Sequence, residues 1–201
     1  SIEGAGMGTT ASFLSSGDDI SFTGGGSFDV ADGVGLTIDP GAGGTIVLDT
    51  GFQGANSGDL LFARAVSLQG GTNIGGPGGM GGSVTFADTI DGAFGLSVST
   101  GSGAISLQGN VGRTTALSSL TIDSGAGLDI LNIGTVAAEG VTGALDIDAA
   151  ADITYNGTEY ASGSADYNAG GQHSVVSGDT TFSTRGTLTF AGGDIVLTDG
   201  S

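Results

Sequence analysis

The chain lacks cysteine and lysine, and it contains only two prolines among its 201 residues. Without cysteine, neither disulfides nor thiolate metal sites can hold the fold together. The only cations are Arg64, Arg113 and Arg185, against 21 acidic residues, which gives a formal net charge of −18. Nucleic acids and anionic membranes attract cationic surfaces, because phosphate groups must be neutralised. We therefore exclude nucleic acid as a partner.

Long apolar runs are also absent. No stretch approaches the roughly 18 consecutive apolar residues that a membrane-spanning helix requires, so membrane insertion is not expected. The first four residues, Ser1 to Gly4, show neither the basic region nor the apolar segment of a signal peptide. We expect the chain to be either mature after cleavage or a segment of something longer.

Glycine is abundant, with 43 residues, but it shows no three-residue period, so a collagen triple helix is excluded. Disordered chains combine low hydrophobicity with high charge. Here 38% of the residues are hydrophobic and only 12% are charged. The composition therefore predicts a folded chain that is rich in turns.

The stretch 83–123 shows two periods at once. Apolar residues alternate within short runs, and the runs themselves recur after 21 positions. The four pairs at this spacing are Val84 and Ile105, Phe86 and Leu107, Ile90 and Val111, and Leu96 and Leu117. Similar spacings of 23 positions separate Ile105 from Leu128 and Ile130 from Ile153.

This double period predicts an all-β fold, a parallel β-helix of about eight coils. A sandwich or an antiparallel barrel is the alternative, but neither requires a fixed register between successive strand pairs. We expect one domain or segment over 1–201, with a weakly patterned stretch at 1–17 and inserted loops at 70–82 and 156–174. The predicted core, stacked one coil apart, comprises Val84, Phe86, Ile105, Leu107, Ile130 and Ile153.

Two motifs within 83–133 carry a resemblance to a known family. They are Ile90-Asp91-Gly92-Ala93 and the run from Val111 to Leu117, which reads VGRTTAL. This region resembles the repeats of filamentous-haemagglutinin-like adhesins and other giant bacterial surface proteins. The resemblance implies a right-handed β-helix, export to the cell exterior, and a structural or adhesive role.

The residues do not favour an enzyme. His173 is the only histidine, no nucleophile motif accompanies it, and its polar surroundings predict an exposed loop residue. Polysaccharide-cleaving β-helices need paired carboxylates, or a basic residue with a cation, at an acidic substrate. The dense acidic groups, at 18–19 and 146–152, have no arginine or histidine within twenty residues. The net charge would also repel an acidic polysaccharide.

Several aspartates directly precede an apolar strand residue, and three of them, Asp129, Asp152 and Asp194, are candidates for a metal column. In stacked coils such carboxylates would lie ~4.8 Å apart and repel one another. Two interpretations stay open. The side chains accept hydrogen bonds from turn amides, or a divalent cation, with calcium as the candidate, bridges them.

The combined prediction is a non-enzymatic, extracellular β-helix, a repeat segment or subunit of a bacterial cell-surface fibre. We expect its ends to be covered by more β-helix, through self-association or continuation of a longer chain, and surface glycans of host or neighbouring cells are candidate partners. A carbohydrate-binding or carbohydrate-cleaving β-helix and a phage-type fibre segment are the alternatives. A binding module would expose aromatics, for which Tyr155, Tyr160 and Tyr167 are the candidates, although Tyr155 is expected to face inward.

Overall fold

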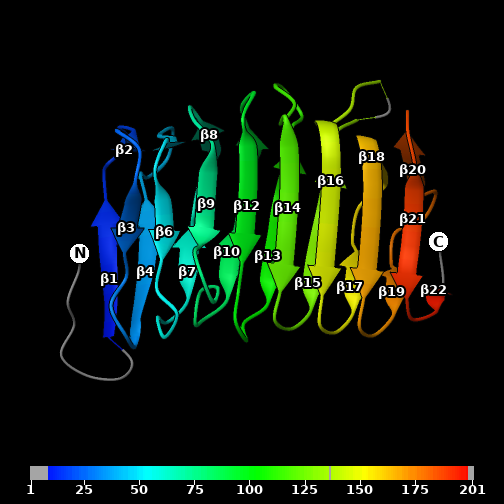
Figure 1. The fold of residues 1–201 in the computed structure, drawn as a ribbon. Coiled ribbons are helices and arrows are strands. Elements are labelled where there is room, and N and C mark those ends of the chain that lie inside the picture. Colours follow the sequence, from blue (N-terminus) through cyan, green and yellow to red (C-terminus); the bar gives the residue numbers. More distant parts are fainter. Residues whose placement is uncertain (1–8, 136, 199–201) are drawn as a thin grey trace.

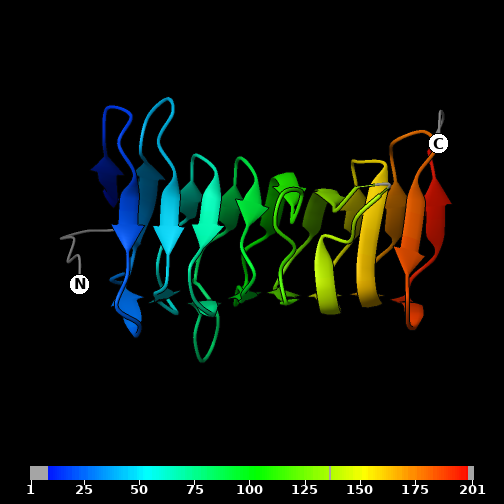
Figure 2. The ribbon, with the colours of Figure 1, turned by 90° about the horizontal axis from the view of Figure 1, so that it is seen from above.

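The computed structural model describes residues 9–135 and 137–198, and these form a parallel β-solenoid of about eight turns without a helix. All 22 strands belong to one continuous sheet that winds around a single apolar interior. The first and last coils lie at opposite ends of the stack (Figures 1 and 2). The predicted fold class is therefore confirmed.

The strands stack into three columns, A, B and C, and every strand pairing within them is parallel. Column A contains β1 (Thr9–Leu14), β4 (Val34–Asp39), β7 (Leu60–Phe62), β10 (Val84–Phe86), β13 (Ile105–Val111), β15 (Leu128–Ile133), β17 (Ile153–Tyr155), β19 (His173–Val175) and β22 (Ile195–Leu197). Column B contains β2 (Ile20–Phe22), β5 (Ile46–Leu48), β8 (Val66–Leu68), β11 (Ile90–Asp91), the ends of β13 and β15, the start of β18 (Glu159–Ala169) and β20 (Thr181–Thr184). Column C contains β3 (Ser27–Asp29), β6 (Gly51–Gln53), β9 (Thr72–Gly75), β12 (Gly95–Ser99), β14 (Ser119–Ser124), β16 (Val141–Ala149), the end of β18 and β21 (Leu188–Gly192).

The alternating apolar residues of each strand point into the interior, because successive side chains of a strand face opposite sides. All six predicted core residues lie there and are at most 1% exposed. Val84 pairs with Ile105 and Phe86 with Leu107, so those two rows stack as the 21-residue spacing predicts. Ile90 likewise pairs with Val111.

Two predicted pairings are wrong because the corners differ in length. Leu96 pairs with Leu120 rather than with Leu117, since the corner between β13 and β14 adds residues before column C resumes. Ile130 pairs with Tyr155, and Ile153 pairs with Leu128. Coils vary from 20 residues, between Ile153 and His173, to 27, between Ile133 and Tyr160.

The prediction that 70–82 is an inserted loop is wrong for most of that stretch. Its strand β9 completes column C, with Thr72 and Ile74 buried, and Met80 bridges to the next coil with no exposed surface. Only the segment between them is a loop. Gly76 and Gly79 have φ values of 59° and 74° there, in the left-handed region that favours glycine.

The stretch 156–174 is likewise not an insertion, because it contains β18, which is eleven residues long. Its alanines, serines and glycines resemble a loop in composition, yet Tyr160 and Tyr167 point inward and are each 1% exposed. The weakly patterned stretch 1–17 contains β1, which pairs with β4 over six residues; residues 1–8 lie outside the described part of the chain.

Candidate functional site

Three of the aspartates that precede strands, Asp19, Asp59 and Asp152, tie one coil to the next. Each accepts a hydrogen bond from a backbone N–H one coil further along, at the equivalent place before a strand. The three bonds are from Thr45 N to Asp19 Oδ1, from Ser83 N to Asp59 Oδ1 and from Gln172 N to Asp152 Oδ1, each 2.8 Å long. These carboxylates therefore satisfy backbone donors at coil corners, as the first of the two interpretations expects.

The three aspartates proposed for a cation column do not come together. Asp129 lies within β15, not before it, because Leu128 is the inward residue that begins the strand. Asp152 and Asp194 precede strands two coils apart, and Gln172 occupies the position between them. Across residues 9–135 and 137–198, no group of three histidine, aspartate or glutamate side chains could hold a metal ion.

A separate acidic row lies on the outer face of column C. Asp146 of β16 pairs directly with Asp166 of β18, and Asp148 follows on the same strand face. Partial desolvation, together with the charges of Asp148 and Asp166, raises the pKa of Asp146. Asn168 donates to Asp148 Oδ1 at 2.7 Å, which compensates one carboxylate of the row.

His173 was predicted to be an exposed loop residue, and this is wrong. It lies in β19 with no exposed surface. Its Nε2 lies 2.9 Å from the carbonyl oxygen of Ala191, and its Nδ1 lies 3.0 Å from the Tyr155 hydroxyl. The Nε2–H therefore donates to the carbonyl, while Nδ1 accepts from the hydroxyl, so both ring nitrogens are used inside the core.

The three tyrosines are all buried, so Tyr155 faces inward as expected, and none of them supplies the exposed aromatics that a carbohydrate-binding module would need. They pack with Phe182 and Phe190 at ring-centroid distances of 4.8 Å, from Tyr160 to Phe182, and 5.2 Å, from Tyr167 to Phe190. Desolvation raises the pKa of all three phenols well above the usual value of 10. The spacings Tyr160 to Phe182 and Tyr167 to Phe190, 22 and 23 residues, match the coil length and could have revealed them.

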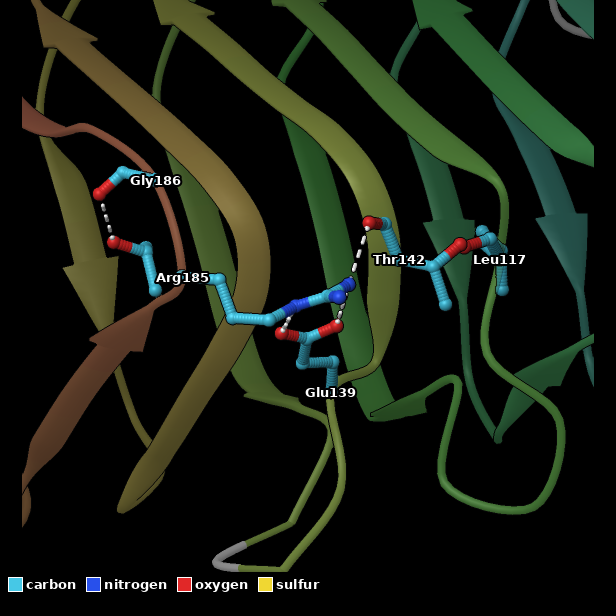
Figure 3. Close-up of polar contacts among 6 residues, drawn as sticks. Leu117, Glu139, Thr142, Arg185 and Gly186 are labelled. Atoms are coloured by element: carbon cyan, nitrogen blue, oxygen red, sulfur yellow. Dashed lines mark hydrogen bonds and ion pairs between the residues drawn. The ribbon is translucent and has the colours of Figure 1, made fainter.

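An ion pair, shown in Figure 3, joins the last coil to an earlier one. Arg185, which follows β20, contacts Glu139 through Nε at 2.5 Å and through Nη2 at 2.6 Å. The same Nη2 donates to the carbonyl oxygen of Thr142 at 3.2 Å. Glu139 lies in the corner before β16, so this contact passes over the intervening coil and joins residues 46 positions apart.

The C-terminal end of the described solenoid is open. A cavity of about 390 Å³ lies there, with Tyr155 and His173 deep inside and Phe182 and Phe190 on its walls. Leu197, at its rim, is 66% exposed, although the preceding members of its row are buried. The mouth is therefore a cross-section of the apolar core.

The N-terminal end of the described solenoid is lined by aromatic rings. Three phenylalanines, Phe13, Phe22 and Phe28, fill the first coil with edge-on contacts at centroid distances of 5.2 to 5.8 Å. Each is only partly buried, because no described strand lies beyond them. The N-terminal end thus presents a layer of three phenylalanines, and the C-terminal end presents an apolar cavity.

A scan against protein-family models gave no match, and searches of curated proteins and of solved structures gave none either. Among the described residues, no helix has the length and apolar character required to cross a bilayer.

Proposed function

We propose that this chain is a non-enzymatic structural element of an extracellular bacterial fibre or adhesin. The observation that carries the proposal is the continuity of the core. The inward rows run through every coil to both ends, where three strands at each end have, within residues 9–135 and 137–198, a partner on one side only. Unpaired edges of this kind template further parallel strands, so more β-solenoid is the partner that the ends fit.

The use of the polar side chains supports a structural role. Asp19, Asp59 and Asp152 bind backbone amides of the next coil, and both nitrogens of His173 bind groups inside the core. Arg185 pairs with Glu139. These side chains thus hold one coil on another.

The resemblance of 83–133 to adhesin repeats supports the cellular place. That stretch contains β10 to β15, and the 21-residue spacing holds there where β10 and β11 pair with β13. A right-handed coil, export to the cell surface and contact with glycans of host or neighbouring cells belong to this proposal. A carbohydrate-binding module is less well supported, because Tyr155, Tyr160 and Tyr167 are buried.

Immunogold electron microscopy on the source bacterium tests this function. Antibodies raised against the folded chain should label fibres or the outer surface of intact cells, and pre-adsorption with purified protein should remove the label. Label confined to the interior of permeabilised cells would contradict a surface role.

A further inference from the structure

The three columns do not contain the same number of strands. Within residues 9–198, column A contains nine strand positions, whereas columns B and C contain eight each. The first strand of the described residues, β1, and the last, β22, both lie in column A. The described solenoid is therefore eight complete coils plus one strand.

The extra strand determines which positions are vacant at the C-terminal end. Continuing the spiral beyond β22, the next strand would lie over β20 in column B, the following one over β21, and the third over β22. These three strands each have one partner in the described solenoid. At the other end, β1, β2 and β3 also have one partner each and follow one another in the same spiral order.

We propose that a second copy of this chain docks end to end, with its β1 on β20, its β2 on β21 and its β3 on β22. This inference rests on the proposed structural function and names the partner of the open ends. All three free edges gain a parallel neighbour in this arrangement. Stacking β1 on β22 instead would leave β20 and β21 facing a gap one strand wide, ~4.8 Å of additional separation.

The side chains fit the same arrangement. The inward residues of β1, Ala11 and Phe13, come over the row of Phe182, while Phe22 of β2 comes over the row of Phe190. The three phenylalanines at the N-terminal end of one copy thus face the apolar cavity of about 390 Å³ at the C-terminal end of its neighbour. Offset and edge-on aromatic contacts are favourable at the ring distances already present at both ends.

The contact joins two different surfaces, so it does not close on itself and generates a filament. Each copy contributes 25 strand positions, three to a coil, which gives an axial rise of about 40 Å per copy at ~4.8 Å per coil. Each copy also turns by one face relative to its neighbour. Because every copy carries a charge of −18, assembly should strengthen as salt screens the repulsion, with a Debye length of about 10 Å at 0.1 M.

Engineered cysteines test the register, since the natural chain has none. Ser12 faces outward on β1, Ser183 outward on β20 and Val196 outward on β22. The double variant Ser12→Cys with Ser183→Cys should give a ladder of disulfide-linked oligomers on oxidation in moderate salt. The matched variant Ser12→Cys with Val196→Cys should stay monomeric on denaturing gels. The reverse pattern, or equal ladders from both variants, would overturn the register.

Variants at the two ends test the polarity. Ala11→Asp and Leu197→Asp each place a carboxylate at one end, on a side chain that is not fully buried. Each alone should be monomeric by light scattering, and their equimolar mixture should form 1:1 dimers. Phe94→Asp, at a side chain 40% exposed on the lateral surface, should assemble like the natural chain. Dimers of either single variant would reveal contacts between like ends and overturn the proposal.

Circular dichroism on each variant separates lost docking from lost folding, and Phe94→Asp controls for added charge. A natural chain that stays monomeric in moderate and high salt would overturn the docking of copies. That result would not contradict the surface role, because further coils of a longer chain could cover the same ends. The immunogold experiment tests the surface role separately.

Discussion

Alkaline pH is the sharpest chemical test of the C-terminal core, because all three tyrosines of the chain lie in it. Burial raises the pKa of Tyr155, Tyr160 and Tyr167 above the value near 10 that a phenol has in an unfolded chain. Their contribution to the free energy of unfolding is therefore fully present below pH 10. It is lost as the pH rises from 10 towards the raised values of the folded state.

The size of the effect follows from proton linkage. Above pH 10 each buried phenol lowers the free energy of unfolding by about 1.4 kcal/mol per pH unit, so three lower it by about 4 kcal/mol per unit. Domains are stable by only about 5–15 kcal/mol. We therefore expect cooperative unfolding a few pH units above 10, with an uptake of about three hydroxide equivalents.

The assay follows tyrosinate absorbance and far-ultraviolet circular dichroism through the same titration. Both signals should change together in one steep transition, and Tyr167→Phe should reduce the slope from three protons to two. Gradual ionisation centred near pH 10 with unchanged circular dichroism would refute the burial of these side chains.

Three further predictions concern other parts of the solenoid. Leu107 is 1% exposed and lies between Phe86 and Ile130 in the core. Leu107→Asp should lower the free energy of unfolding by several kcal/mol, whereas Leu107→Met should lower it by less than about 1.5 kcal/mol. Equal urea midpoints for the two variants would contradict the register. Asp146→Asn should raise the melting temperature, because it removes repulsion from Asp166, which is worth up to about 1 kcal/mol for a cross-strand pair. The control is Asp129→Asn, which should leave the melting temperature unchanged because Asp129 lies between the uncharged Ser106 and Thr154. Arg185→Ala should lower the melting temperature only slightly, because exposed ion pairs are screened, and a large fall in scanning calorimetry would show that the contact with Glu139 anchors the last coils.

The sequence predicts the solenoid where short apolar runs recur without intervening changes of corner length. Val84, Phe86, Ile105 and Leu107 satisfy this condition, and their stacking follows from spacing alone. Leu96 does not, because the corner before β14 adds residues that no local pattern announces. A 21-residue rule therefore fails at the next column while the architecture stays the same.

The polar interior could not be predicted from residue type. His173 is buried because Tyr155 and the Ala191 carbonyl supply partners for both its nitrogens, and those partners are brought together only by the coil register. Strand β18 was not predicted, because its serines, glycines and alanines are as typical of a loop as of a strand. The predicted cation column does not form, because β15 starts one residue earlier than predicted, at Leu128. This shift moves Asp129 from the corner to the outer face of the strand.

Electron microscopy of the purified chain in moderate salt tests the central claim, that open solenoid ends join copies into a fibre. The expected result is unbranched filaments one solenoid wide, with an axial rise of about 40 Å per copy and a ~4.8 Å spacing along the axis. Isolated particles one chain long, at every salt and protein concentration, would contradict it.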